Sequence, residues 1–265
     1  MTAGTSEDKV SIIVPAYFTN DENQKYLDLC LRSIKAQTHT NYEVIVSSSG
    51  PQKPIVPDNY RHVHSEERLH FPKAVNQGVR ASDPNSKYVF ILNDDVCLTQ
   101  TCTEVLVEAV GNNSVVANPL SNCDNFARYQ MVVGFNRGED FCPVPVRFMR
   151  YNQIEGDEEL LIKAKSIYPP GLINQNWLAI YATMIPRRIW DMVGEIDENF
   201  KTGQDDLDWC LRARKLNIPS VVAIHALAWH FGGVTSSLVI DNEMREHNFK
   251  TFRDKWGISP EQAGF

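Results

Sequence analysis

Apolar residues recur along the chain in short blocks whose spacing changes between strand-like and helix-like patterns. Unbroken apolar runs of four to eight residues favour buried strands, and apolar residues three or four positions apart favour amphipathic helices. An apolar run over residues 10–14 is followed by helical spacing over residues 24–37 and by a second strand-like run over residues 42–46. A strand, a helix and a strand with short joins form the unit of a parallel sheet, so the pattern predicts an α/β fold.

The same alternation continues towards the carboxyl terminus and predicts a single domain. Residues 121–171 interrupt it, because Asn, Gly and Pro occur throughout and only residues 157–165 have helical spacing. We interpret this segment as an irregular insertion over the sheet edge that binds an acceptor, closes as a lid or is disordered, since long loops in compact domains are often functional. Further strands are expected at residues 61–63, 88–92, 115–117, 177–185 and 220–224, and further helices at residues 71–80, 101–110, 205–214 and 238–255, with a short helix opening at residue 186.

The most informative strand is the apolar run over residues 88–92, which is followed at once by Asn93, Asp94 and Asp95. In open α/β sheets, ligands bind outside the carboxyl ends of the strands. Two carboxylates held there form a hard-oxygen site for a divalent cation that can also hold phosphate oxygens. The alternative interpretation is a strand followed by a plain Asx turn.

A second acidic group opens the helix expected at residues 205–214, where Asp205, Asp206 and Asp208 lie in or next to the first turn. A helix N-terminus favours the charged forms of such residues. Capping could use one acid, but three acids in four positions are more than a cap requires.

Weaker candidates for contact with a ligand lie after other predicted strands. Pro15-Ala16-Tyr17 and Ser47-Ser48-Ser49 are expected to be turns whose backbone N–H groups can face a ligand, although each could be a plain turn. Arg68 and Lys73 stand near a predicted helix start and could meet a diphosphate, or could simply be solvated. His230 precedes two glycines, as if a backbone must pass close to a ligand, whereas a lone histidine after an apolar run is usually structural.

Composition excludes some classes of protein. The formal net charge is −7 without charged blocks, which argues against a nucleic-acid partner, although a local basic patch stays open. No apolar run has membrane-spanning length, and residues 1–9 are short and polar, unlike a signal peptide. The six cysteines form no C-x-x-C pair, which favours reduced thiols in a cytoplasmic protein and no zinc site. Lys250, Arg253 and Lys255 on the last helix leave peripheral membrane contact open.

Taken together and in this order, these segments resemble family 2 of the glycosyltransferases, the inverting enzymes with a GT-A fold. The resemblance covers roughly residues 9–257 and rests on a set of motifs. The matching segments are residues 10–17, 30–38, 74–78, 92–96, 205–212 and 255–257, with His230 where many members place a metal-binding histidine.

The resemblance implies one GT-A domain over residues 1–265, with a Rossmann-like, mixed and mostly parallel sheet flanked by helices. Residues 9–120 would bind the nucleotide sugar, residues 121–235 the acceptor, and residues 236–257 would form a C-terminal helix. The implied reaction moves a sugar from a nucleotide-sugar donor to an acceptor hydroxyl with inversion. A saccharide or glycolipid acceptor, as in polysaccharide biosynthesis, is the usual class, and modified DNA or a protein side chain stays open.

The resemblance also implies roles for single residues. Asp206 would be the general base with Asp205 beside it, and Asp95 and His230 would hold Mn²⁺ or Mg²⁺. Trp177 and Asp208 would bind the acceptor, although Asp205 and Asp208 could instead anchor their helix. The nucleotide sugar would contact Pro15, Ala16, Tyr17, Ser47, Ser48, Arg68, Lys73, Asn76, Asn93 and Asp94.

Two positions depart from the family pattern. Asn93 replaces the first acid of Asp-x-Asp, so that Asp95 carries more of the metal binding. Serines 47–49 stand where many members have an aspartate that reads uracil, which leaves UDP, dTDP and GDP open as the donor nucleotide. A non-catalytic binding module with the same fold is an alternative. A nucleotidyltransferase is another, although it would usually carry a glycine-rich phosphate loop after the first strand.

Overall fold

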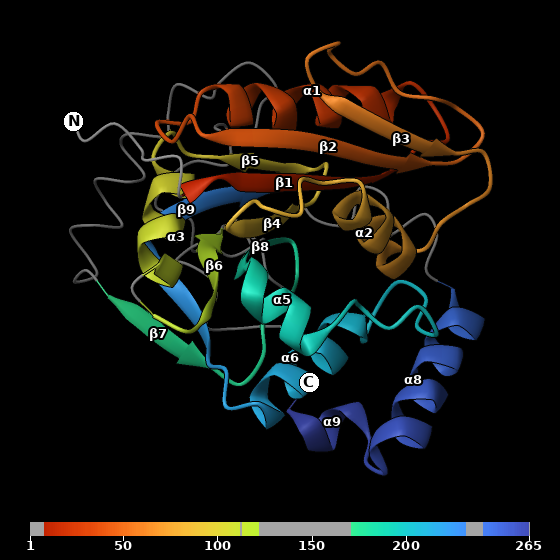
Figure 1. Ribbon diagram of the computed structural model, residues 1–265. Coiled ribbons are helices and arrows are strands. Elements are labelled where there is room, and N and C mark those ends of the chain that lie inside the picture. Colours follow the sequence, from red (N-terminus) through yellow and green to blue (C-terminus); the bar gives the residue numbers. More distant parts are fainter. Residues whose placement is uncertain (1–7, 112, 122–170, 232–240, 265) are drawn as a thin grey trace, which may run out of the picture.

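The computed structural model describes residues 8–111, 113–121, 171–231 and 241–264 (Figure 1). The predicted insertion therefore lies almost wholly outside the described residues, as does its helix over residues 157–165. The strands are β1 (Val10–Tyr17), β2 (Tyr42–Ser49), β3 (Arg61–Ser65), β4 (Tyr88–Leu92), β5 (Val96–Leu98), β6 (Val116–Ser121), β7 (Leu172–Gln175), β8 (Ala182–Pro186) and β9 (Ser220–His230). The helices are α1 (Glu22–Lys35), α2 (Phe71–Arg80), α3 (Cys102–Gly111), α5 (Arg187–Val193), α6 (Asp205–Lys215), α8 (Asn242–Trp256) and α9 (Pro260–Ala263).

The strands form one mixed sheet in the order β3-β2-β1-β4-β8-β6-β9-β5, with β7 paired to β9. The pairs β3–β2, β2–β1 and β1–β4 are parallel, and so is β6–β9. The pairs β4–β8, β6–β8, β5–β9 and β7–β9 are antiparallel. The predicted α/β class, with a mixed sheet flanked by helices, is confirmed.

Alternate residues of the central strands enter two separate apolar cores. Ile13 and Ile91 face one side of the sheet, where α2, α5, α6 and α8 supply the covering residues. Ile12 and Phe90 face the other side, which α1 and α3 cover. Helix α2 lies so close to β1 that a Cβ on Gly78 would stand 2.4 Å from a methyl group of Ile13, so only glycine fits. This close packing fixes where α2 begins relative to the strand ends.

Strands β1 and β2 are longer than the sequence pattern predicted. They stay paired from Val10 opposite Tyr42 to Tyr17 opposite Ser49, so the predicted turns at Pro15 and at the serines are wrong. Proline is tolerated here because β1 loses β4 as a neighbour after Ile13, and beyond that point β1 is an edge strand on that side.

Other boundaries also differ. Strand β8 begins at Ala182 instead of residue 177, and β9 continues beyond residue 224 to His230. Strand β5 was not predicted, because three residues are too short to show a pattern. The four described cysteines are free and buried, as predicted: Cys30, Cys97, Cys102 and Cys210. Across the described ranges, no helix combines the length and the apolar character needed to cross a membrane.

Candidate active site

The acidic turn after β4 meets the end of β9. Residues Asn93–Asp95 connect β4 to β5, and β5 pairs with β9 so that Val96 lies opposite His230. The backbone N–H of Phe231 donates to the carbonyl of Asp95 at 3.0 Å. As a result, Nε2 of His230 lies 3.2 Å from Oδ1 of Asp95, although the two residues are far apart in the sequence.

The chemistry of this pair fits a divalent cation. Two ligands at about 2.1 Å from one octahedral ion lie about 3 Å apart, which matches the separation of Asp95 and His230. The side-chain oxygen of Asn93 is buried in the same turn and has no hydrogen-bond partner. Within the described ranges, no group of three His, Cys, Asp or Glu side chains is placed to hold a metal. Phosphate and water oxygens would therefore complete the coordination, as is usual for Mg²⁺.

Asp94 and Asp95 are both buried. Burial, followed by the charge of Asp95, raises the pKa of Asp94 well above the ordinary value. Of the two acids, Asp95 is the one whose carboxylate lies 3.2 Å from His230. Asp95 is therefore the better candidate for a metal ligand.

The first two acids of helix α6 differ in how deeply they are buried. Asp205 is 3 % exposed, and its Oδ1 accepts the backbone N–H of Gly203 at 2.7 Å. Burial, and then the charge of Asp206, raises the pKa of Asp205 well above its ordinary value. Asp206 is only half-buried, and its Oδ1 accepts the N–H of Leu207 at 2.7 Å. Of these two acids, Asp206 is therefore the one more accessible from solvent.

The loop before α6 is held by other elements. The amide of Asn248 on α8 bonds the N–H of Lys201 at 2.9 Å and the carbonyl of Thr202 at 3.1 Å. The hydroxyl of Thr202 accepts the N–H of Phe71 at 3.5 Å, which joins the loop to the start of α2. Gln204 has φ of 59°, a left-handed conformation that is costly for a residue other than glycine. Such strain persists where surrounding contacts impose it, and here it sets the start of α6.

Asp208 is placed for support and not for acceptor binding. Its carboxylate is fully buried and accepts hydrogen bonds from Arg212 Nε at 3.0 Å and Trp256 Nε1 at 2.8 Å. Lys255 Nζ lies 2.8 Å from the same carboxylate. Asp208 therefore anchors α6 to α8, and we no longer assign it to the acceptor.

We expect Asp208→Asn to lower the free energy of unfolding by about 3 kcal/mol, because breaking a buried ion pair leaves its partners uncompensated. For a domain of this size that corresponds to a fall in Tm of roughly 6–12 °C. Asp254→Asn is the matched control, since Asp254 pairs with Lys250 on the surface and is 63 % exposed. Its Tm should stay within about 2 °C of the wild type. Equal Tm values for the two variants in a thermal melt would contradict the anchoring role.

Two further predicted site residues are used by the fold. Asn76 is fully buried. Its side-chain NH₂ donates to the carbonyl of Ile196 at 2.8 Å and to the carboxylate of Glu198 at 3.0 Å. Its side-chain oxygen accepts the N–H of Ile196 at 3.0 Å. Trp177 is 5 % exposed, and its indole N–H donates to the carbonyl of Gly264 at 2.9 Å. We therefore withdraw Asn76 from the donor site and Trp177 from the acceptor site.

The serines of β2 are also engaged within the fold, Ser47 with α2 and Ser48 with β3. Ser47 donates to the carbonyl of Ala74 at 2.6 Å. The hydroxyl of Ser48 lies 2.8 Å from Nε2 of His62 and 2.7 Å from Nδ1 of His64, both on β3. Because both serines are fully buried, their side chains are not available to a nucleotide.

Other predicted donor contacts remain at the carboxyl ends of the strands. Tyr17 ends β1 half-buried, and the Arg68 guanidinium lies 5.2 Å above its ring. Lys73 is exposed in the first turn of α2, which has no capping side chain and no acid to offset its dipole. Pro15 and Ala16 are buried and can present only backbone to a ligand.

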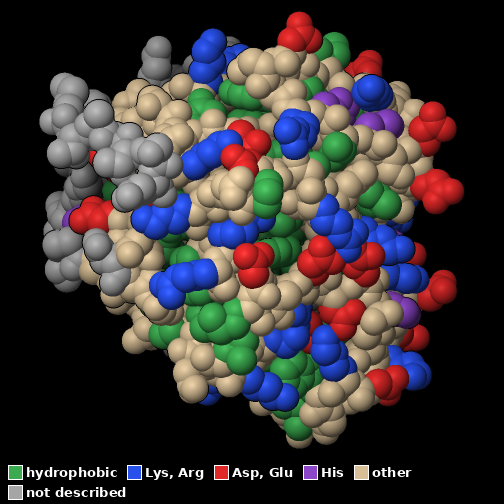
Figure 2. Space-filling view, viewed as in Figure 1, with side chains coloured by type: hydrophobic (Ala, Val, Ile, Leu, Met, Phe, Trp, Pro, Cys, Tyr) green, Lys and Arg blue, Asp and Glu red, His purple; other side chains and the backbone are tan. Residues whose placement is uncertain are grey.

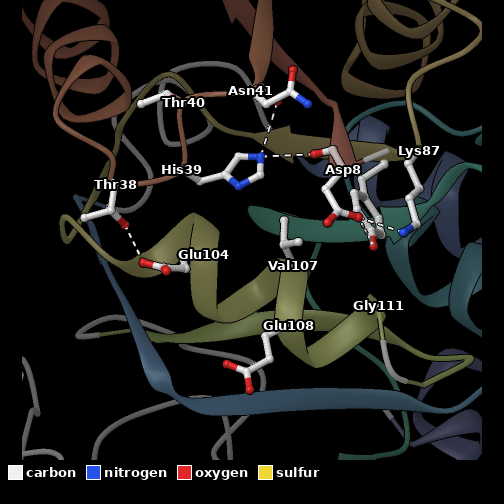
Figure 3. Close-up of a pocket in the computed structure, with 11 residues that line it drawn as sticks. Asp8, Thr38, His39, Thr40, Asn41, Lys87, Glu104, Val107, Glu108 and Gly111 are labelled. Carbon is white, nitrogen blue, oxygen red and sulfur yellow. Dashed lines mark hydrogen bonds and ion pairs between the residues drawn. The ribbon is translucent and has the colours of Figure 1, made fainter. Parts of the chain in front are cut away.

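A separate hollow lies at the opposite edge of the sheet. It has a volume of about 430 Å³ and is lined by residues that precede β1, β2 and β4, together with α3 (Figure 3). Lys87 pairs with Asp8 at 2.7 Å, and His39 bonds the Asp8 carbonyl at 3.1 Å. Since ligands of open α/β sheets bind at the carboxyl ends of the strands, we do not assign this hollow to the active site.

The charge of the surface does not favour a polyanionic partner on the face shown in Figure 2. Lys and Arg side chains alternate there with Asp and Glu side chains over the helices of that face. In the same way, Arg80 of α2 pairs with both Glu195 and Glu198. This mixture agrees with the net charge of −7.

Sequence reasoning missed one residue beside the Asp95–His230 pair. Tyr181, which immediately precedes β8, is 3 % exposed and stacks on the ring of His230. It lay inside a longer apolar run that was interpreted as a strand, so nothing in the pattern distinguished it from core residues.

The comparisons with known proteins agree with this architecture. No curated protein matches the chain. The crystal structure of GalNAc-T7 with UDP, GalNAc and Mn²⁺ aligns with a TM-score of 0.64 at 11 % identity. The alignment covers 96 % of this chain but 49 % of that one, so this chain spans about half its length. At this identity the likeness establishes the GT-A fold alone. The model of glycosyl transferase family 2 matches residues 11–169, more than half of the chain, and the chain therefore belongs to glycosyl transferase family 2.

Proposed function

We propose that this glycosyltransferase moves a sugar from a nucleotide-sugar donor to an acceptor hydroxyl with inversion and with the help of a divalent cation. The observation that carries the proposal is the separation of 3.2 Å between Asp95 and His230 at the carboxyl end of β4. Family membership supports a nucleotide-sugar donor. Inversion and the cation are the finer points that need testing.

The donor would lie across the carboxyl ends of β1 and β4. Asp95 and His230 would hold Mn²⁺ or Mg²⁺, which when bound offsets the charge that develops on the leaving diphosphate. Arg68 and Lys73 add positive charge near the same phosphates, at the uncapped start of α2. Tyr17 would contact the nucleoside, with Arg68 stacked over its ring. Asp94 would contact the donor from the same turn as Asp95.

Asp206 would act as the general base. It would accept the proton of the acceptor hydroxyl while that oxygen attacks the anomeric carbon and the nucleoside diphosphate leaves. One base and one displacement invert the anomeric centre without a covalent intermediate. Asp205 would hold the loop through Gly203, and because its carboxyl group is buried it would be less accessible to the acceptor than Asp206.

The side chains near the proposed donor site say little about which nucleotide the donor carries. Ser47 and Ser48 are bonded to α2 and β3, and neither offers the carboxylate that could accept the N3–H of uracil. The GalNAc-T7 crystal structure contains UDP and Mn²⁺, which makes that pair the first to test, with dTDP and GDP next. The proposed acceptor is a saccharide or a glycolipid.

Thermal melts with UDP, dTDP and GDP, each with Mn²⁺ or with EDTA, test the proposal. At one hundred times its Kd, the correct nucleotide should stabilise the protein by about 2.7 kcal/mol, which raises Tm by roughly 5–10 °C. The shift should disappear with EDTA. If no nucleotide shifts Tm, the donor proposal fails. A shift without transfer or hydrolysis over a panel of nucleotide sugars would instead indicate a non-catalytic binding module, and pyrophosphate release from a nucleoside triphosphate would indicate a nucleotidyltransferase.

A further inference from the structure

We propose that Tyr181 is a positioning residue that sets the affinity of the Asp95–His230 pair for its cation. The inference rests on the proposed function, because it concerns the same metal site. It assigns a role to a residue that touches neither the donor nor the acceptor in the mechanism above.

The side chain of Tyr181 fixes the plane of the His230 ring. The two rings stack with centroids 4.9 Å apart and planes 11° apart. The Tyr181 hydroxyl donates to the carbonyl of Pro119 at 2.9 Å, so the phenol ring is held at both ends. Since Tyr181 is 3 % exposed, its ring cannot turn away without disturbing the core. The stack therefore restricts the rotation of His230 that would move Nε2 away from Asp95.

The backbone of Tyr181 holds the other half of the pair. Its carbonyl accepts the N–H of Asn93 at 2.8 Å, and Asn93 is the first residue of the acidic turn. The next residue, Ala182, lies opposite Leu92 in the β4–β8 pairing. One residue thus contacts both chain segments that supply the proposed ligands, the turn through its backbone and the histidine through its ring.

The choice of tyrosine at this position has a physical reason. A flat ring is needed to cover the imidazole, and the hydroxyl satisfies a buried carbonyl of β6. Phenylalanine would keep the ring and lose only the anchor, whereas leucine would lose both. Residues that orient metal ligands from outside the coordination sphere typically change metal affinity 10–100-fold when replaced.

The test compares Tyr181→Leu with Tyr181→Phe. The readouts are Mn²⁺ affinity, from the electron paramagnetic resonance signal of free Mn²⁺ in the presence of the nucleoside diphosphate, and Tm. Mn²⁺ affinity should fall about 10–100-fold in the leucine variant and stay within about threefold of the wild type in the phenylalanine variant. At saturating Mn²⁺, the leucine variant should recover most of its kcat, since Tyr181 does not touch the substrate.

Tyr88→Leu is the matched control for lost core packing. Tyr88 is 1 % exposed at the other end of β4, with its hydroxyl 3.4 Å from Asp8. This variant should lose stability and keep its Mn²⁺ affinity. If Tyr181→Leu keeps the wild-type Mn²⁺ affinity, or if Tyr88→Leu weakens Mn²⁺ binding equally, the positioning role is overturned.

A metal-free readout separates this inference from the proposed function. In NMR spectra of the metal-free protein, ring current from Tyr181 should shift the His230 ring protons upfield, in the wild type and in Tyr181→Phe but not in Tyr181→Leu. If the wild type shows this shift but binds no Mn²⁺, the proposed metal site fails, and so does a role in metal affinity. If His230 gives the same resonances in all three proteins, the stack does not position the ring and the inference is overturned.

Discussion

Replacement of Asp206 by asparagine is expected to lower kcat by about 10²–10⁴-fold, which is the usual contribution of a well-placed general base. Asparagine has nearly the same shape and can still accept the N–H of Leu207, so the start of α6 should be unchanged. Nucleoside diphosphate and Mn²⁺ should bind as they do to the wild type. A transfer assay at saturating donor and acceptor measures the loss in kcat, and thermal melts with the nucleotide check binding.

Asp205→Asn is the matched control for Asp206. An asparagine oxygen can still accept the N–H of Gly203, and the buried carboxyl group it replaces already has a raised pKa. We expect kcat to stay within about tenfold of the wild type, since Asp205 would not take the proton. Near-normal transfer by Asp206→Asn together with loss of transfer by Asp205→Asn would reverse the assignment of the base.

The central strands, and the positions of two groups of acids at the ends of elements, could be predicted because their signals are local. Residues 88–92 form the predicted strand, and the acids that follow lie at its carboxyl end. The helix at Asp205 also begins where the acids indicated. These features depend on apolar periodicity and on charges at element ends, both of which are visible in a short window of sequence.

The roles of single polar residues could not be predicted in this way. Asp205, Asp206 and Asp208 look equivalent along the chain. In the structure, however, the carboxylate of Asp208 is hydrogen-bonded to Arg212, one helical turn later, and to Trp256. The spacing of four residues could have suggested the contact with Arg212. Nothing in the neighbouring sequence suggested the contact with Trp256, which lies on another helix. Asn76 bonds a backbone 120 residues away, so its structural role depends on the folded topology.

The serines of β2 show a different limit. Ser47 and Ser48 follow an apolar run and were interpreted as a ligand-facing turn, whereas both lie in a strand that continues to Ser49. The histidines of β3 give Ser48 its partners, and they come together with it only through the parallel β2–β3 pairing. A single strand does not reveal whether its polar residues will find partners in the next one.

Replacement of Asp95 by asparagine is expected to weaken Mn²⁺ binding at least 100-fold and to lower kcat/KM by about 10²–10³-fold. A bound cation typically supplies several kcal/mol of stabilisation to developing charge, and each 1.4 kcal/mol corresponds to tenfold in rate. The substitution keeps the shape of the side chain, and an amide oxygen can still accept a hydrogen bond from His230 across the separation of 3.2 Å. Calorimetric titration with Mn²⁺ in the presence of the nucleoside diphosphate measures the first effect, and a transfer assay over a range of Mn²⁺ concentrations measures the second.

Asp94→Asn provides the sharpest control, because it removes a neighbouring acid from the same buried turn. Burial and the charge of Asp95 raise the pKa of Asp94, and an amide of the same shape fits the same buried position. The Mn²⁺ affinity of Asp94→Asn should stay within a few-fold of the wild type. A high Mn²⁺ concentration should restore part of the activity of Asp95→Asn and should leave that of Asp94→Asn unchanged. Loss of Mn²⁺ binding in Asp94→Asn, with normal binding in Asp95→Asn, would place the cation on the other acid and would contradict the pairing of Asp95 with His230, whose Nε2 lies 3.2 Å from Asp95.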